Sequence, residues 1–81
     1  MIKDYFGHEI HEGDILLYNK RGCHGHHTSF SEGIAVGFER GRVKVLSREY
    51  YDENCLNWYE VKFGTNIINL TALNIRERIE I

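Results

Sequence analysis

Proline is absent from this sequence of 81 residues, and the chain has little net charge, few cysteines and no long apolar run. No segment approaches the roughly 18 consecutive apolar residues of a membrane-spanning helix, so we expect no membrane partner. The formal net charge of −2 excludes a generic basic nucleic-acid binder, because non-specific affinity for phosphate comes from clustered lysine and arginine. A local basic patch is still compatible with this charge balance.

Cysteine is scarce as well, since Cys23 and Cys55 are the two in the chain. The first residues lack the apolar stretch of a secretory signal, so we expect a cytoplasmic protein with reduced thiols. A disulfide between the two cysteines stays open at the level of sequence. Cys55 is expected in the core, where free cysteine usually packs.

The chain does contain enough apolar material for one core. The hydrophobic fraction is 42 %, with one tryptophan, five tyrosines and four phenylalanines. We therefore expect a single domain over residues 1–81. A domain of this size buries a limited share of its surface, so a metal, a disulfide or a partner chain often supports the core. Self-association through an open sheet edge or exposed aromatics would supply such support.

Eight glycines divide the chain into short segments rich in β-branched and aromatic residues, a spacing typical of a small all-β fold. Alternation predicts a hairpin of residues 33–38 and 42–45 that turns at Gly41. Residues 15–19 predict an earlier strand with apolar side chains on both faces. Residues 20–31 show no periodicity and predict a long loop.

The second half of the chain predicts two further strands. Alternation indicates a strand at residues 58–63. Its buried face would carry Tyr59, Val61 and Phe63. Residues 50–54 indicate a polar loop, and residues 67–73 fit a strand, a helical turn or one after the other. Residues 74–81 are expected to form a closing strand, because barrels remove exposed edges.

Two stretches carry a resemblance to a known fold family. Residues 6–18, in which Gly13-Asp14 precedes an apolar run, look like the start of the first strand in KOW, Tudor and related modules. Residues 32–38 and 41–45 resemble the central hairpin of the same modules. The resemblance implies a mainly β fold, a small five-stranded SH3-like barrel with a long loop after the first strand. Such barrels serve many unrelated roles, so the fold alone does not name a function.

The same stretches are also similar to short, mostly uncharacterised proteins encoded by tailed bacteriophages. That similarity implies a small accessory protein that engages a host factor in the host cell cytoplasm.

All five histidines lie within the first 27 residues. With Cys23 they form the pairs His8-x-x-His11 and Cys23-x-x-His26, and imidazole and thiolate are natural ligands of zinc. The spacing predicts a zinc site from His8, His11, Cys23 and His26 or His27, which would also stabilise an undersized core. The alternative is a polar loop whose histidines are solvated.

Four aromatic residues, Tyr50, Tyr51, Trp58 and Tyr59, lie on two segments joined by one predicted loop. Aromatic side chains bind cations in cages and stack on the bases of single-stranded nucleic acid. Alternation points Tyr59 toward the core and Trp58 away from it. Trp58 together with Tyr50 or Tyr51 would then form a partner surface, whereas the alternative is that these rings build the core.

Basic side chains gather in the first half of the chain. Arg42 and Lys44 share the outer face of one predicted strand, and Arg48 follows it. They would contact phosphate or an anionic partner. Glu39 and Glu49 lie close in sequence and offset the charge, so a solvated strand face is the alternative.

No phosphate-binding loop, catalytic triad or paired-carboxylate motif is present, so we expect no enzymatic activity. The leading hypothesis is a binding module for a protein or ligand. Its site residues are expected in the loop 21–30 and on the neighbouring aromatic face: His24, His26, Phe30, Tyr51 and Trp58. The alternatives are a nucleic-acid-binding barrel that uses Arg42, Lys44 and Arg48, and a zinc-stabilised module.

Overall fold

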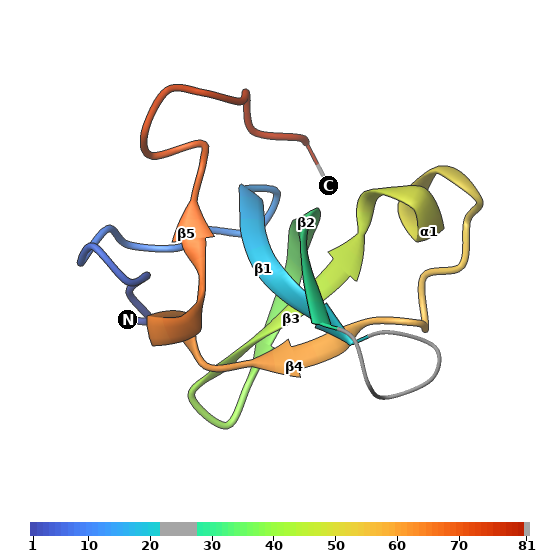
Figure 1. Ribbon diagram of the computed structural model, residues 1–81, viewed down its shortest axis with the longest axis horizontal. Coiled ribbons are helices and arrows are strands. Elements are labelled where there is room, and N and C mark those ends of the chain that lie inside the picture. Colours follow the sequence, from blue (N-terminus) through green and yellow to red (C-terminus); the bar gives the residue numbers. More distant parts are fainter. Residues whose placement is uncertain (22–27, 81) are drawn as a thin grey trace.

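Five antiparallel strands and little helix make up the fold in a computed structural model that describes residues 1–21 and 28–80 (Figure 1). The strands are β1 (Ile15–Arg21), β2 (Thr28–Glu39), β3 (Arg42–Ser47), β4 (Glu60–Lys62) and β5 (Ile68–Asn69). Two short helical elements lie between them, the α-helix α1 (Arg48–Asp52) and the 3-10 helix η1 (Gly64–Asn66). The strands form one sheet in the order β4-β3-β2-β1-β5, and within the described chain its end strands are not paired with each other.

The long strand β2 belongs to both halves of this sheet. It pairs with β1 over residues 28–34 and with β3 over residues 33–39. The register with β3 shifts between Ala35 and Gly37, an irregularity of the kind that bends a strand. The sheet is accordingly strongly curved, and the predicted hairpin of β2 and β3 is confirmed (Figure 1).

The concave side of the sheet holds an apolar core. Its buried members are Ile10, Leu16, Tyr18, Ala35, Val43, Val45 and Ile67. Gly33 makes room for this packing, because a Cβ at that position would lie 2.6 Å from Cε1 of Tyr18 and 2.7 Å from Cγ1 of Val45. The Tyr18 ring therefore lies directly against the backbone of β2.

A second apolar cluster, which we call the outer cluster, covers the opposite face of β1 and β2. Its buried members are Ile15, Ile34 and Leu70, and partly buried side chains pack around them: Leu17, Val36, Tyr51, Ile68 and Ile79. Tyr51 comes from α1 and Ile79 from the C-terminal segment, so these two elements cover part of the outer face. Both faces of β1 are thus at least partly covered, as their apolar pattern predicted.

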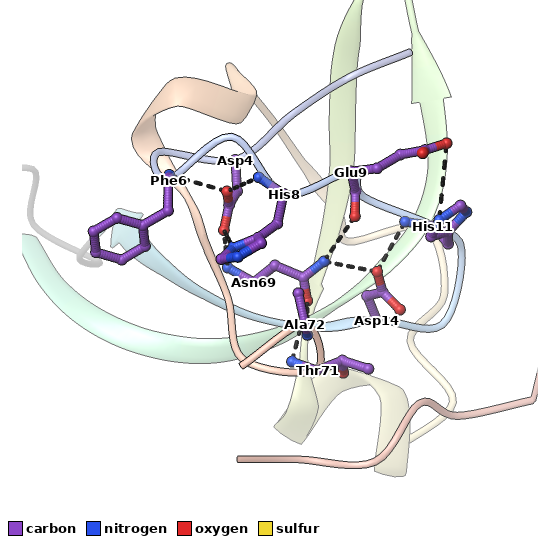
Figure 2. A network of polar contacts seen from close by, with 9 residues as sticks. All are labelled: Asp4, Phe6, His8, Glu9, His11, Asp14, Asn69, Thr71 and Ala72. Carbon is purple, nitrogen blue, oxygen red and sulfur yellow. Dashed lines mark hydrogen bonds and ion pairs between the residues drawn. The ribbon is translucent and has the colours of Figure 1, made fainter. Parts of the chain in front are cut away.

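A polar network ties the N-terminal segment to β5, with Asn69 at its centre (Figure 2). Asn69 is fully buried, and its side-chain amide donates to the Asp14 carboxylate at 2.8 Å and to the Glu9 carbonyl at 3.2 Å. Its side-chain oxygen accepts the backbone N–H groups of Thr71 and Ala72 at 3.1 and 3.2 Å. This side chain therefore uses all of its ordinary hydrogen-bonding capacity inside the protein.

Asp4 extends the network to the first turn of the chain. Its buried carboxylate accepts the backbone N–H groups of Phe6, His8 and Asn69 at 3.0, 2.7 and 2.8 Å. A carboxylate without such partners would be costly to bury. These three bonds therefore compensate its burial and hold the turn against β5.

The C-terminal segment joins the network through Asp14. The Nε group of Arg78 donates to the Asp14 carboxylate at 2.6 Å, and the N–H of Ile79 donates to the carbonyl of Gly13 at 2.9 Å. Gly13 has a φ of +89°, and a Cβ there would collide with the carbonyl oxygen of Ile79. Glycine is needed here both for the backbone conformation and for the close approach of the C-terminal segment.

Two of the expected loops are wrong in extent. β1 continues to Arg21 and β2 begins at Thr28, so strand pairing occupies both ends of the predicted loop 20–31. The predicted loop 50–54 begins inside α1. Arg48 and Asp52 of α1 are four residues apart with 3.8 Å between Nε and Oδ1, a spacing that supports a helix.

The end of the chain also differs from expectation. The strand that pairs with the free side of β1 is β5, whereas residues 74–80 contain no strand. Side-chain hydrogen bonds and isolated backbone hydrogen bonds hold this segment against the rest of the chain, in place of strand pairing. Phe63, expected on a buried face, is 52 % exposed, because the strand ends at Lys62. Over residues 1–21 and 28–80, no helix is long and apolar enough to cross a membrane.

Candidate binding groove

An open hollow of about 440 Å³ lies beside β1 and β5, and its lining combines an apolar floor with exposed rings. The lining residues come from the N-terminal segment, four strands and the 3-10 helix: Tyr5, Leu17, Asn19, Phe30, Lys62, Thr65, Asn66 and Ile68. We call this hollow the groove. Its volume falls in the range of about 300–1,000 Å³ that is typical of ligand pockets.

The apolar floor of the groove is the uncovered part of the outer cluster. Leu17 and Ile68 belong to both. Strand pairing sets Leu17 opposite Ile68 of β5, and Asn19 opposite Phe30 of β2. Residues two apart on a strand share a face, so these four side chains extend the face that α1 and the C-terminal segment cover elsewhere.

Two aromatic rings stand at this floor with most of their surface in solvent. Phe30 is 72 % exposed and Tyr5 is 69 % exposed. An exposed apolar patch beside a hollow is typical of surfaces that bind a partner. Phe30 is one of the residues that the sequence indicated as a binding residue, and its ring lines the groove.

The groove carries little charge. Among its described lining residues, Lys62 alone bears a formal charge, and its Nζ lies 3.1 Å from Oε1 of Glu60. Glu32 lies opposite Leu17 in the β1–β2 pairing, but Arg76 binds its carboxylate with two donors at 2.9 and 3.3 Å. The groove is therefore an apolar site with amide and hydroxyl groups and one cation.

A second exposed aromatic group lies near α1. Tyr50 and Trp58 meet edge to face with ring centroids 5.1 Å apart, and Trp58 is 61 % exposed. Lys20 stands over the Tyr50 ring at 4.8 Å. Tyr51 packs into the outer cluster, so the partner that the structure gives to Trp58 is Tyr50.

The side chains of Ser47 and Glu60 lie near the Tyr18 phenol on the concave side of the sheet. Burial raises the pKa of the Tyr18 phenol to about 12, and the nearby Glu60 carboxylate adds to the rise, while a hydrogen bond with Ser47 opposes it. Lys20 donates to the Ser47 hydroxyl at 3.4 Å. The Tyr18 phenol is therefore neutral near pH 7 and acts as a buried structural group.

The predicted basic face is divided in the structure. The Arg42 guanidinium lies 4.4 Å from the Phe63 ring centroid, and Lys44 Nζ lies 5.0 Å from that of Tyr59. Arg48 is in α1 and not on the β3 face. Arg42 and Lys44 are therefore engaged with rings of the neighbouring chain segment, and Arg48 does not join them.

The predicted zinc ligands are only partly within the described residues. Nδ1 of His8 lies 3.5 Å from the Asp4 carboxylate, and Nε2 of His11 lies 3.8 Å from that of Glu9. Over residues 1–21 and 28–80, no three histidine, cysteine or acidic side chains gather as a metal site. Cys23, His24, His26 and His27 lie outside the described residues, so the zinc site stays a prediction. Cys55 is half-buried and free.

Most groove residues other than Phe30 were not foreseen. The alternation of β1 contained one usable signal, because Leu17 faces away from Leu16 and Tyr18 and needs its own cover. Tyr5 and Lys62 gave no such signal. They reach the groove only through the folded arrangement of segments far apart in sequence.

The fold and groove define a small, mainly β protein with an open apolar site. The sequence model of a family described as a domain of unknown function, DUF7205, matches residues 2–66, and the chain belongs to this family. The match ends at Asn66, so it includes β1 to β4 and η1 but not β5 or the C-terminal segment. Searches of curated proteins and of solved structures find no match to the chain.

Proposed function

We propose that this protein is a non-enzymatic binding module that takes a segment of a protein partner in the groove. The observation that carries the proposal is the Phe30 ring, which stays 72 % exposed beside the apolar floor of Leu17 and Ile68. A large ring that stays in solvent contributes little of the stabilisation that it would give when buried. A bound partner would bury it and gain that stabilisation. The similarity to short phage-encoded proteins supports an accessory protein that engages a host protein in the host cytoplasm.

The charge of the groove favours a protein over a nucleic acid. A phosphate backbone is bound by several lysines and arginines, and its affinity depends on them. Among the described lining residues the groove offers only Lys62, which already has Glu60 as a neighbour. Amide and hydroxyl groups of Asn19, Thr65 and Asn66 suit the backbone of a peptide instead.

The buried polar groups support a binding role over catalysis. The carboxylates of Asp4 and Asp14 and the amide of Asn69 are bonded to one another or to the backbone. A general base or nucleophile needs a group that can reach a substrate. These groups instead hold the fold together.

The strand arrangement supports an SH3-like barrel as the architecture of this module. The order β4-β3-β2-β1-β5, a bent second strand shared by both halves, and a 3-10 turn before the last strand fit that barrel. A solved structure in which β4 and β5 complete the closure would test this assignment.

Pull-downs from lysate of the producing cell test the proposed function. Three immobilised variants are compared with the wild type: Phe30→Ser in the groove, Trp58→Ser at the second aromatic group, and Phe38→Ser as a matched control. Phe38 is an exposed ring near the other end of β2 and does not line the groove. We expect a protein that wild type and Phe38→Ser retain and that Phe30→Ser loses.

Two results would contradict the groove as the site. One is a partner that Phe30→Ser retains and Trp58→Ser loses, which would move the site to the Tyr50–Trp58 pair. The other is the absence of any protein retained by the wild type above the level of empty beads.

A nucleic-acid-binding barrel is the second candidate, favoured by the adjacent cations Arg42 and Lys44 on β3. The rings of Phe63 and Tyr59 contact these two cations, and the contacts would have to break before the rings could stack on bases. Binding to single-stranded DNA or RNA at low salt, with affinity that falls steeply as salt is added, would support this candidate.

A further inference from the structure

We propose that the groove takes its partner as an added β-strand, in which an extended peptide pairs with the free edge of β1 at Asn19 and Arg21. This inference rests on the proposed function and specifies how the same site recognises its partner. Strand addition of this kind obtains affinity from main-chain hydrogen bonds and specificity from alternate side chains.

The edge arises because β5 is much shorter than β1. β1 pairs with β2 along its whole length, from Ile15 to Arg21. β5 pairs only with Leu16 and Leu17. In the described chain, β1 therefore has strand neighbours on both sides at Leu16 and Leu17. From Tyr18 onward its only strand neighbour in that part of the chain is β2.

The backbone groups on the free side can be assigned from Ile15. Its N–H donates to the Thr71 hydroxyl at 2.9 Å and its carbonyl accepts the Leu70 N–H at 2.9 Å, so both groups point toward β5. In an antiparallel strand the direction of these groups alternates from residue to residue. The N–H and carbonyl of Asn19 and of Arg21 therefore point to the same side as those of Ile15, where β5 no longer covers them.

The chain leaves this edge open because η1 turns away from it. Continuing the β5 register would set Asn66 opposite Asn19. The N–H of Asn66 instead donates to the Phe63 carbonyl at 3.0 Å, inside the 3-10 turn. Asn19 and Asn66 both line the groove, so the position of the missing strand pair is hollow and accessible.

The surroundings define the chemistry of the peptide. A strand laid along Asn19 would direct alternate side chains toward Phe30 and Leu17, which favours apolar residues at those positions. Lys62 is the one charge of the described lining, so an acidic side chain complements it. The partner is therefore an extended segment with alternating apolar residues and at least one Asp or Glu.

The test uses a phage-displayed library of random twelve-residue peptides selected on the folded, full-length protein. Peptides that bind the wild type and Phe38→Ser but not Phe30→Ser are synthesised. Each is then prepared with a single N-methyl group at successive residues. Because N-methylation removes one main-chain donor, we expect affinity to fall roughly tenfold at alternate residues and less than about threefold at those between them.

A protein variant tests the same bonds from the other side. Asn19→Pro removes the outward N–H, at an edge position that tolerates proline, while Asn19→Ala keeps it. Both variants lose the Asn19 side-chain amide and differ in the outward N–H, so we expect Asn19→Pro to bind the selected peptides roughly tenfold more weakly than Asn19→Ala. If Asn19→Pro does not fold, the N-methyl series on the wild type still decides.

The outcomes separate this inference from the proposed function. Groove-dependent peptides whose affinity shows no alternation with N-methylation overturn strand addition and leave the groove as a binding site. The absence of any peptide that depends on Phe30 overturns both.

Discussion

Ile68 and Asn69 are neighbours in β5, yet the structure uses them in opposite ways. Asn69 is fully buried, and its side chain is hydrogen-bonded to four other residues. Ile68 faces the groove, where an aromatic ring and a strand edge lack partners within the described chain. The difference indicates that the network around Asn69 supports the fold, whereas the groove is the surface at which we propose that a partner binds.

The strongest test of this contrast is Asn69→Ala. It removes four hydrogen bonds, takes one partner from the buried Asp14 carboxylate, and leaves the part-buried N–H groups of Thr71 and Ala72 without their acceptor, so we expect a loss of about 3–5 kcal/mol in the free energy of unfolding. Asn66→Ala is the control, since that side chain is exposed at the groove and should cost less than about 0.5 kcal/mol. Urea unfolding followed by circular dichroism measures both, and equal losses would break the contrast.

A smaller loss is expected where the C-terminal segment joins the network. Gly13→Ala forces a side chain onto a residue with a φ of +89° and into the Ile79 carbonyl. We expect it to lower the free energy of unfolding by about 2–3 kcal/mol, from backbone strain together with the collision.

Gly7→Ala is the matched comparison for that change. Gly7 has a φ of +87°, but a Cβ there meets nothing within 4 Å, so only the strain of about 1 kcal/mol remains. The difference between the two variants measures how tightly the C-terminal segment is held. If Gly7→Ala were the more damaging change, the segment would contribute little.

Tyr18 lies on the face of β1 opposite the groove, and the pH dependence of stability tests its burial. Its pKa is raised from 10.0 to about 12 in the folded protein, so the unfolded chain loses the phenol proton first. The stability that the neutral phenol provides is therefore complete below pH 10 and is lost as pH rises from about 10 to 12. We expect the advantage of wild type over Tyr18→Phe in urea unfolding to shrink between pH 8 and pH 11, and a constant advantage would contradict the burial of the phenol.

The smallest effect on stability is expected in the groove itself. Phe30→Ser changes a ring that is 72 % exposed, so the free energy of unfolding should change by less than about 0.5 kcal/mol. Thermal unfolding of the variant beside wild type measures this. A loss as large as that of Gly13→Ala would show that Phe30 supports the fold, and its effect on binding would then need a different variant.

The sequence was sufficient where one periodic pattern determines the structure. The hairpin of β2 and β3 follows from alternation around Gly41, and Val43 and Val45 are buried as that pattern requires. The apolar side chains on both faces of β1 also follow from its unbroken apolar run.

Long-range contacts explain what the sequence could not provide. Asn69 looks like an ordinary polar residue until folding brings Asp4 and Asp14 to it, 65 and 55 residues away in the chain. The same holds for the groove, which Tyr5, Phe30 and Lys62 reach from separate segments. The expected closing strand at residues 74–81 was wrong for a related reason, because single contacts to Gly13 and Asp14 take the place of strand pairing.

The distance in sequence between Asn69 and its partners also has a consequence for synthesis. A growing chain that has not reached residue 69 has the carboxylates of Asp4 and Asp14 but lacks Asn69. The backbone N–H of Asn69 donates to Asp4, and its side-chain amide donates to Asp14. The hydrogen bonds that hold the N-terminal turn and the Asp14 carboxylate to Asn69 therefore form only after residue 69 has been synthesised, and contacts of this separation form slowly. We expect a chain truncated after Ile68 to be unfolded by circular dichroism and readily cleaved by proteases, so that an interrupted translation product would be removed and would not persist as a half-folded domain.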